Sequence, residues 1–349
     1  MEARDSVGGC ASTVADLGAR FNICACDHSL IRAMPLIDEL NLSSHGLDYL
    51  EPEATYVNAF HENSGSWVFY HDSNQTMDGL SITHPSEVAN YKRYLEDAIP
   101  VAKLVIEIAQ SGASMTEFLQ VASRKRMKGV SKLLRWSKAS AVDVFKDYFD
   151  DWHLYMPGIS TGPTVWGAPP EAPGTGLAAT VYATRHLIAS GRPRRGSGSL
   201  PDAILKSYLS NGGQVRLKSI VEKLQVENKR VKAVQLQDGS VIEAPTVIAA
   251  CDPHTVLVNW IDEAPVSAKS LISRWQKEPA PEGYESKLDG VVQNLPTYKF
   301  MSELTGKFDH TDLTQSTVVI SPSPKKLKEA HILKDLSLIH ISEPTRQKP

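Results

Sequence analysis

The first residues of the chain combine a carboxylate, a guanidinium and a pair of glycines. Glu2 and Arg4 precede Gly8 and Gly9 in the pattern E-x-R-x-x-x-G-G. In a dinucleotide-binding βαβ unit, an acidic side chain at the end of a strand holds ribose hydroxyls, and glycines let backbone N–H groups approach the pyrophosphate. The pattern is compatible with that chemistry, although an ordinary turn explains the same residues.

A complete dinucleotide-binding unit also needs G-x-G-x-x-G after its first strand. The chain contains no such motif. The stretch "GSGSLP" (Gly196 to Pro201) lacks the third glycine and follows no obvious strand, so we reject it as that fingerprint. This absence argues against a nicotinamide-dependent dehydrogenase.

Four longer stretches carry a family resemblance. They are "EARDSVGGCAST", "FNICACDHSLIRAMPLIDELNLSSHGLDYLEPE", "GTGLAATVYATRHLIASGRPRRGSGSLPDAI" and "GGQVRLKSIVEKLQVENKRVKAVQLQDGSVIEAPTVIAACDP". Together they resemble the phytoene desaturase-like family of FAD-dependent oxidoreductases, which are relatives of carotenoid desaturases and amine oxidases. The resemblance covers about residues 1–300.

The resemblance implies which residues contact the FAD cofactor. Glu2 would bind ribose, and the main chain of Val221 would meet adenine. The other implied contacts are Arg4, Gly8, Gly9 and Ala11 near the pyrophosphate or ribityl chain, and Cys251 and Asp252 at the end of a strand returning to the cofactor. Val221 is alternatively a plain strand position, and Asp252 alternatively caps a turn before Pro253.

The resemblance also points to a substrate side. Asp27 and His28 fall where the family's chain passes the flavin ring, and His28 either orients substrate or is a hydrogen-bonded structural histidine. Trp152, Tyr155 and Trp166 are candidates for a substrate pocket or for an ordinary aromatic core.

The family's chemistry moves hydride from a substrate to flavin, and the electrons then pass to oxygen or a quinone-like acceptor. The flavin carries this chemistry, so no catalytic acid or base is predicted. The apolar, aromatic middle of the chain suits a small hydrophobic substrate. The alternative is a non-catalytic interaction module derived from the substrate domain.

The implied fold is α/β (α+β overall), a two-domain arrangement of the glutathione-reductase-like or amine-oxidase type. A partial Rossmann-like FAD domain accompanies a mixed sheet-and-helix substrate domain. The expected boundaries are 1–48 (FAD), 49–190 (substrate or cap), 191–260 (return to the FAD domain), 261–335 (incomplete substrate domain) and 336–349 (artefactual tail).

Against the family's pattern, the chain is expected to be truncated at both ends. It lacks the G-x-G-x-x-G unit and the C-terminal glycine-rich segment, and "LSLIHISEPTR" (Leu336 to Arg346) resembles the in-frame translation of a sequencing adapter. We therefore expect this chain alone to be inactive and not to retain FAD. We also expect an incomplete sheet with exposed apolar surface near Glu2 and a strand at Thr246–Cys251.

The elements that position these residues follow from periodicity and turn chemistry. Strands are predicted over "ATYVNAF" and "SWVFYH", and helices over 34–42, 84–110, 115–149, 177–190 and 201–211. The proline- and glycine-rich stretch 151–176 indicates a packed loop lining a cavity. "ENKR" and "QDGS" indicate hairpin turns, and "TVIAAC" indicates a strand buried on both faces.

Composition restricts the partners. A net charge of −3 with no excess of Lys and Arg argues against nucleic acid as the main partner. The basic run from Ser123 to Lys138 is either a solvated helix face or a peripheral membrane contact. The four cysteines show no zinc-ligand spacing, so no metal is predicted. Without a signal peptide or an apolar span, a cytoplasmic, optionally membrane-associated protein is expected.

Overall fold

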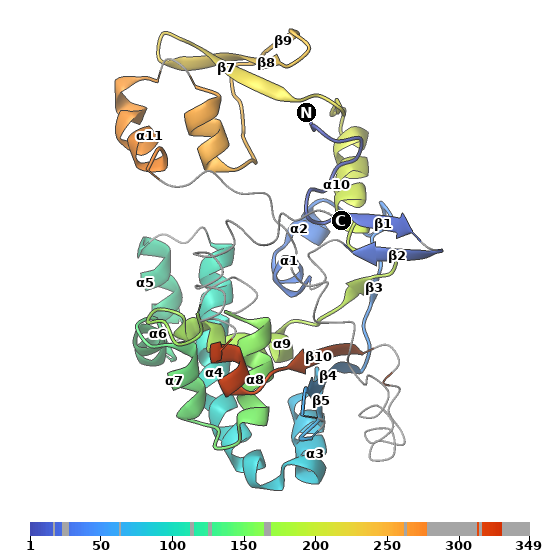
Figure 1. The fold of residues 1–349 in the computed structure, drawn as a ribbon, viewed down its shortest axis with the longest axis vertical. Coiled ribbons are helices and arrows are strands. Elements are labelled where there is room, and N and C mark those ends of the chain that lie inside the picture. The colour runs from blue at the N-terminus through green and yellow to red at the C-terminus, as the bar shows by residue number, and fades with distance from the viewer. Residues whose placement is uncertain are drawn as a thin grey trace, which may run out of the picture. The chain divides into compact units, whose positions relative to one another are not determined.

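The computed structural model describes residues 1–16, 18–22, 28–62, 64–111, 115–124, 128–163, 169–261, 264–277, 313 and 316–329. The chain divides into two compact units (Figure 1). Unit 1 comprises Met1–Ala25, Asn41–Leu47 and Arg195–Gln293. Unit 2 comprises Cys26–Leu40, Asp48–Arg194 and Asn294–Pro349.

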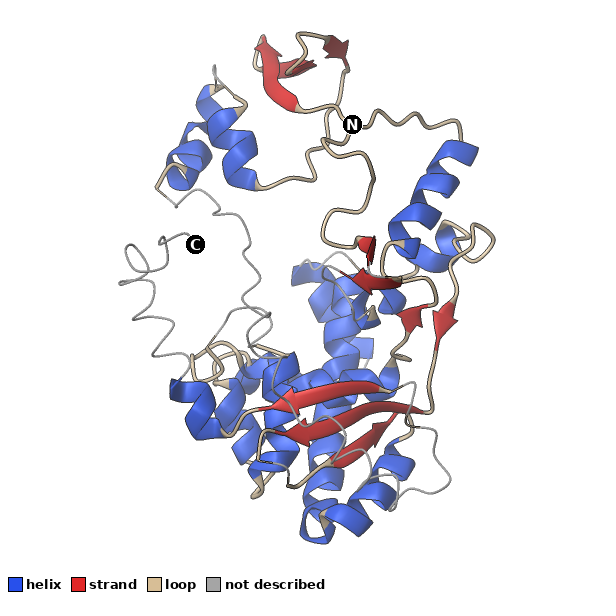
Figure 2. Ribbon diagram, turned by 45° about the vertical axis from the view of Figure 1, so that its right-hand side comes forward, coloured by secondary structure: helices blue, strands red, loops and turns tan. Residues whose placement is uncertain are grey.

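Unit 2 contains a three-stranded sheet in the order β10–β4–β5. The central strand, β4 (Ala54–Phe60), pairs in parallel with β10 (Thr317–Ser321) and antiparallel with β5 (Trp67–Tyr70). Figure 2 shows these strands side by side among the helices of unit 2. Every residue of β4 and β5 is buried, which accounts for their nearly continuous apolar sequence. Both strand predictions are confirmed.

Helices make up most of the rest of unit 2. They are α1 (Ser29–Ala33), α2 (Leu36–Glu39), α3 (Ser73–Thr83), α4 (Val88–Gln110), α5 (Met115–Arg124), α6 (Val130–Trp136), α7 (Ala141–Lys146), α8 (Trp152–Thr161) and α9 (Val181–Leu187), with 3₁₀ turns η1 (Pro85–Glu87) and η2 (Gly176–Thr180). The short pair β3 (Tyr49–Leu50) and β6 (Arg192–Pro193) also belongs to this unit.

The segments of unit 2 that were predicted as helices are helical, but their boundaries differ from the prediction in places. η1 and α4 together fill 85–110, as predicted. The stretch predicted as one helix from 115 to 149 instead forms α5, α6 and α7. Gly129 has a φ of 80°, and Ser140 caps α7 by accepting a hydrogen bond from the Asp143 amide. Gly129 is the N-cap of α6 and Ser140 is the N-cap of α7, so each marks the start of a separate helix.

The prediction of a packed loop over 151–176 is wrong for its first part, which is helix α8. Asp151 caps this helix by accepting a hydrogen bond from the His153 amide. Pro157 lies inside the helix and cannot donate to the His153 carbonyl. The indole N–H of Trp67 donates to that carbonyl instead, at 2.9 Å, so the proline is tolerated.

An aromatic core fills unit 2. Fully buried rings of Phe69, Tyr91, Tyr94, Phe145 and Tyr182 pack with ring centroids about 6 Å apart. The buried hydroxyls remain hydrogen-bonded, as such groups must. Tyr94, for example, donates to the Ala179 carbonyl at 2.6 Å. Burial raises the pKa of the Tyr94 hydroxyl far above its usual range.

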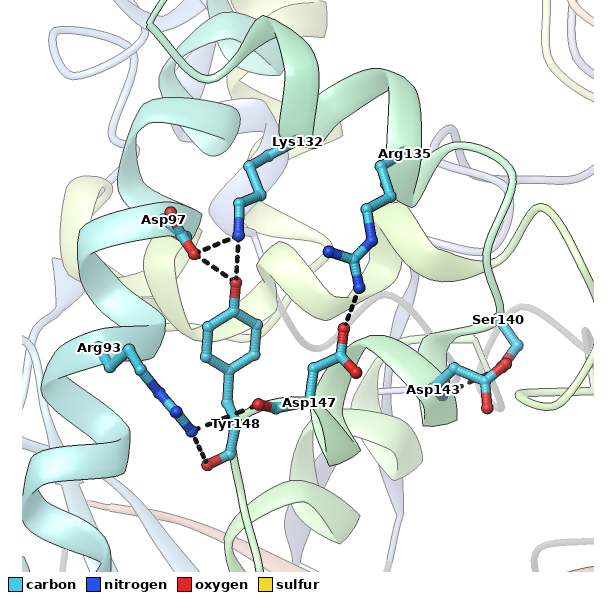
Figure 3. A network of polar contacts seen from close by, with 8 residues as sticks. All are labelled: Arg93, Asp97, Lys132, Arg135, Ser140, Asp143, Asp147 and Tyr148. Carbon is cyan, nitrogen blue, oxygen red and sulfur yellow. Dashed lines mark hydrogen bonds and ion pairs between the residues drawn. The ribbon is translucent and has the colours of Figure 1, made fainter.

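A polar network joins α4, α6 and the end of α7 (Figure 3). Lys132 Nζ and the Tyr148 hydroxyl each donate to Asp97 Oδ2, both at 2.6 Å. Arg135 pairs with Asp147 nearby, and Arg93 donates to the carbonyls of residues 147 and 148. Partial burial acts to raise the pKa of Asp97, but the bonds from Lys132 and Tyr148 outweigh it and hold that pKa below its usual value.

Unit 1 contains a hairpin, a helix and a second small sheet. The hairpin is β1 (Thr13–Asp16) with β2 (Ala19–Asn22), and the helix is α10 (Ser199–Ser210). β7 (Val221–Glu227), β8 (Arg230–Leu236) and β9 (Val241–Glu243) form an antiparallel sheet. The π-helical turn η3 (Thr255–Asn259), the 3₁₀ turn η4 (Val266–Ala268) and helix α11 (Lys269–Trp275) follow.

The two hairpin turns of this sheet were predicted correctly. Asn228 and Lys229 have φ angles of 51° and 65°, and Gly239 has 83°. Two successive positive φ angles match the twist of paired strands.

Another prediction about unit 1 is wrong. Residues 246–251 form no strand, and Ile248 is 90% exposed. No strand among the described residues pairs with this segment, and an apolar run without neighbouring strands has no ladder to join. Residues 261–277 group with unit 1, and Trp260 and Ile261 pack on the core of the β7–β9 sheet. The predicted domain boundaries stay a prediction.

Exposed apolar surface was expected near Glu2 and near Thr246–Cys251, and the structure has apolar side chains exposed in both places. Met1 is 50% exposed and Ile220 is 48% exposed, in addition to Ile248.

Candidate functional site

A cavity of about 470 Å³ lies within unit 1. Three parts of the chain form its wall: the N-terminal segment with the β1–β2 hairpin, the short segment containing His45, and the start of α10. The lining residues are Ser6, Val7, Ser12, Thr13, Val14, Ala15, Arg20, His45, Arg195, Gly198, Ser199, Asp202 and Lys206.

Glycines bring the start of α10 against the hairpin. Gly196 has a φ of 90°, and a Cβ there would lie 2.4 Å from Thr13 Oγ1, so no larger residue fits. The Gly198 amide donates to Thr13 Oγ1, and the Ser197 amide donates to Asn22 Oδ1, both at 2.9 Å. The segment "GSGS", which we rejected as a fingerprint, therefore forms part of the cavity wall.

The predicted pair Gly8–Gly9 packs on the same helix. Gly8 has a φ of 115°, and a Cβ there would lie 2.7 Å from Pro201 Cγ in the first turn of α10. The Ala11 amide donates to the Gly8 carbonyl at 2.8 Å, which closes the turn. Gly9 has a φ of 54° and open space where a Cβ would point. The turn thus holds the chain before β1 beside the start of α10.

The cavity has cationic walls. Arg20, Arg195 and Lys206 line it, with His45 also present and Asp202 as the opposing carboxylate. Arg195 Nη2 donates to the Gly46 carbonyl at 2.6 Å, and Lys206 Nζ donates to the His45 carbonyl at 3.4 Å. These bonds hold both cations at the wall. The amino-terminal end of a helix adds further positive potential. This arrangement favours an anionic ligand such as a phosphate group.

Several predicted cofactor residues lie outside this cavity. The Glu2 carboxylate accepts a hydrogen bond from the Arg4 amide at 3.0 Å, and their side chains lie 3.7 Å apart. The backbone of residues 2–4 pairs with residues 216–219, just before β7. Val221 is half-buried against the core of the β7–β9 sheet. Their contacts with a cofactor stay predictions.

The other two cofactor candidates lie in the segment before η3. Cys251 is exposed, and Asp252 Oδ2 accepts a hydrogen bond from the Thr255 amide at 2.8 Å. Asp252 therefore makes the turn-capping contact that its position before Pro253 suggests.

The predicted substrate-side residues lie in unit 2. His28 is buried, and its Nδ1 lies 3.0 Å from the Tyr49 hydroxyl, whose pKa burial raises to about 12 despite the nearby Arg32. Trp152 stacks on His153, and Tyr155 stacks on Phe145 in the aromatic core. Asp27 and Trp166 lie outside the described residues.

Sequence reasoning found the glycine turn but missed the cations. Arg20 and Lys206 lie outside the recognised stretches, and Arg195 was not singled out within its own. The three cations converge only when the hairpin and α10 pack together. The glycines of "GSGS" were the available signal, since close backbone approach often needs glycine.

Comparison with known proteins identifies the family. Residues 1–286 match the family described as flavin containing amine oxidoreductase. The chain belongs to this family.

The chain is also similar to two phytoene desaturases, as its predicted family resemblance implied. The chain is 25% identical over 276 residues to a lycopene-forming phytoene desaturase from Pantoea ananas, and 22% identical over 275 residues to one from Pseudescherichia vulneris. Each match covers 77% of this chain and 54% of the relative, so the chain spans about half the length of these relatives.

Two solved structures show a similar fold. Putrescine oxidase bound to putrescine is 18% identical, with a TM-score of 0.51 over 78% of this chain and 56% of that one. An oxidoreductase from Methanosarcina mazei is 13% identical, with a TM-score of 0.50 over 78% and 57%. The predicted α/β fold and the predicted flavin-dependent, phytoene desaturase-like family are confirmed.

The described helices include none with the length and apolar character needed to cross a bilayer.

Proposed function

We propose that the protein is an FAD-dependent oxidoreductase whose unit 1 cavity binds the phosphate-bearing part of FAD. The main observation in support is that Arg20, Arg195 and Lys206 converge on a cavity whose wall includes the start of α10. Family membership supports this, because the family is flavin-containing. The residues present fit the cofactor, since two phosphates need fixed cations and close backbone approach.

Each part of the wall has a role in this proposal. Arg20, Arg195 and Lys206 neutralise the phosphate charge. Gly198 lines the cavity and carries no side chain, so the backbone there can approach the ligand. Gly8 packs against Pro201 and so holds the segment before β1 beside the start of α10. FAD, when bound, supplies the redox chemistry by accepting a hydride from the substrate. The protein's task is then to hold the cofactor, exclude water and align the substrate, and no acid or base is assigned.

We further propose that a hydrophobic substrate undergoes desaturation or dehydrogenation, with oxygen or a quinone-like acceptor taking the electrons. The similarity to lycopene-forming phytoene desaturases supports an apolar substrate. Unit 2 is the proposed substrate domain, and His28, Trp152 and Tyr155 are its proposed pocket residues.

A peripheral membrane contact is the remaining part of the proposal. The basic run from Ser123 to Lys138 contains the exposed Leu134, and Leu119 in the preceding α5 is 60% exposed. Basic side chains beside exposed leucines suit an anionic bilayer surface. A membrane would give an apolar substrate a route to the enzyme.

FAD titration tests the cofactor site. Because the chain contains no G-x-G-x-x-G, the titration uses a fusion that places the corresponding βαβ unit of the Pantoea ananas relative before Met1. Arg195→Gln removes one cation from the cavity, and we expect a loss of FAD affinity of about 10- to 100-fold, which is typical of a hydrogen bond to a charged group.

The neighbouring Arg194 provides the matched control. It is exposed, pairs with Asp48 within unit 2 at 2.6 Å, and is not among the residues that line the cavity. Arg194→Gln should leave FAD affinity unchanged. Equal effects of the two substitutions, with both proteins folded, would refute the proposed site. If the folded fusion binds no FAD, the interaction-module alternative takes its place.

A further inference from the structure

Two histidines and an aspartate meet where α3 ends and α8 begins. His84 is the residue that follows α3, Asp151 caps α8, and His153 lies in the first turn of α8. One ligand atom from each side chain lies within 4.8 Å of the others. All three belong to unit 2, so their arrangement is internal to one compact part of the chain.

The atom separations are close to those of a metal site. His153 Nδ1 lies 2.6 Å from Asp151 Oδ1, and His84 Nε2 lies 3.9 Å from Asp151 Oδ2. Two ligand atoms on a tetrahedral Zn²⁺ lie roughly 3.4 Å apart, given bond lengths of about 2.1 Å. Shifts of less than about 1 Å in side-chain position would therefore give coordination geometry.

Packing fixes the ring of His153. The ring stacks on Trp152 with centroids 3.8 Å apart and meets the edge of Phe60 at 4.7 Å. Gly65 also lies against the ring, because a Cβ there would lie 2.3 Å from His153 Cδ2. Nδ1 is the ring nitrogen that faces Asp151. A ring held in this way loses little freedom on binding a metal.

The surroundings are rich in negative charge. Glu87 is 2% exposed, and its carboxylate accepts hydrogen bonds from the Asp151 amide at 3.0 Å and from Asn90 Nδ2 at 3.1 Å. In the described part of the chain, neither Glu87 nor Asp151 forms an ion pair with a lysine or arginine. Two neighbouring carboxylates without a lysine or arginine partner among the described residues favour a divalent cation.

We propose that His84, Asp151 and His153 bind a divalent transition metal of the Zn²⁺ class through His84 Nε2, one carboxylate oxygen of Asp151 and His153 Nδ1. Two imidazoles and a carboxylate are a ligand set that such metals take. The Asp151 side chain is 35% exposed, so water can reach the site and complete the coordination. Glu87 acts as a positioning residue, because it holds the backbone of Asp151. The metal joins the end of α3 to the start of α8.

Cobalt(II) is the probe for this site, because its visible absorption reports coordination geometry. The full chain is treated with a chelator, desalted and titrated with Co²⁺, and Zn²⁺ is then added as a competitor. We expect one equivalent to bind, with the absorption of a nitrogen- and oxygen-ligated tetrahedral ion, and Zn²⁺ to displace it. A version with Cys10, Cys24, Cys26 and Cys251 changed to Ser separates this signal from thiolate binding.

Substitutions assign the ligands. His84→Gln and Asp151→Asn should each weaken metal binding by at least about tenfold. Replacing a residue that only hydrogen-bonds to a metal ligand already costs about tenfold, so loss of a ligand should cost no less. Asn caps helices as well as Asp does, so Asp151→Asn removes the charged ligand while keeping the cap of α8. His61→Gln, at a half-buried histidine after β4, is the control and should bind as the unchanged protein does.

Thermal unfolding gives a second measurement. Excess Zn²⁺ should raise the Tm of the unchanged protein and not that of Asp151→Asn, because only the folded site binds the metal. The proposal is overturned if no Co²⁺ binds, or if both ligand variants bind it as tightly as the control. In that case the Asp151–His153 contact is a hydrogen-bonded helix cap only. The outcome is independent of FAD binding in unit 1.

Discussion

Replacing Tyr182 by Phe should destabilise unit 2, because one buried hydroxyl makes two hydrogen bonds there. Tyr182 is 1% exposed. Its hydroxyl donates to the Leu154 carbonyl at 2.7 Å and accepts from the Gly158 amide at 2.8 Å. Both partners belong to α8, on either side of Pro157. The hydroxyl thus stabilises the helix at the position where the proline weakens its internal hydrogen bonding.

The expected loss follows from the groups left without a partner. A buried donor or acceptor whose partner is removed costs about 1–3 kcal/mol. If the Leu154 carbonyl and the Gly158 amide pair with one another after substitution, part of this cost is recovered. We therefore expect Tyr182→Phe to lower the free energy of unfolding by about 2 kcal/mol, while ring packing with Phe69 and Phe145 is retained.

Urea unfolding followed by near-ultraviolet circular dichroism measures this loss. The control is Tyr208→Phe, since Tyr208 is 52% exposed and its hydroxyl makes no hydrogen bond among the described residues. That substitution should change the free energy of unfolding by less than about 0.5 kcal/mol. If Tyr182→Phe behaves like Tyr208→Phe, the hydroxyl does not stabilise α8 and the reasoning is wrong.

Further predictions concern pH, charge and the glycine turn. Burial lowers the pKa of His186 to about 4, so as the pH falls the unfolded chain binds a proton at this residue before the folded chain does. The free energy of unfolding should therefore fall by up to about 3 kcal/mol between about pH 6.5 and pH 4. Urea unfolding at a series of pH values measures this. Asp97→Asn should cost about 1 kcal/mol at neutral pH. Because folding lowers the pKa of Asp97, the stabilisation by its carboxylate is present above the pKa of an unfolded aspartate, about 3.9, and this difference should shrink in urea unfolding as the pH falls below that value. Gly8→Ala should weaken FAD binding by the fusion in fluorescence titration, and Gly9→Ala should weaken it less, since only Gly8 is in tight contact with Pro201. Equal effects of the two alanines would contradict the close packing of Gly8.

The elements that the sequence predicted well are those whose own residues determine their burial. β4 and β5 are buried along their whole length, so their apolar runs are direct signals. The failures involve distant partners. Helix α8 forms in a proline- and glycine-rich stretch because Trp67 and Tyr182 hydrogen-bond to its backbone. The segment containing Ile248 has an equally strong strand signal and forms none, since a strand needs a neighbour to pair with.

In the candidate site, too, residues with a local conformational requirement were predicted, and residues brought together by packing were not. The paired glycines Gly8 and Gly9 were visible in the sequence because their conformation is a local requirement. Arg20, Arg195 and Lys206 were not, because ordinary surface cations have no sequence signature until packing brings them to one cavity. His84 and His153 were missed for the same reason, since the sequence separates them widely and packing brings them together with Asp151.

The most direct test of the central claim is the flavin content of the fusion protein that carries the added βαβ unit. The purified protein is mixed with FAD, passed through gel filtration, and its visible absorbance is compared with its protein concentration. Binding at the proposed cavity predicts close to one FAD per chain and a flavin spectrum that differs from that of free FAD. A folded fusion that elutes without flavin would contradict the account.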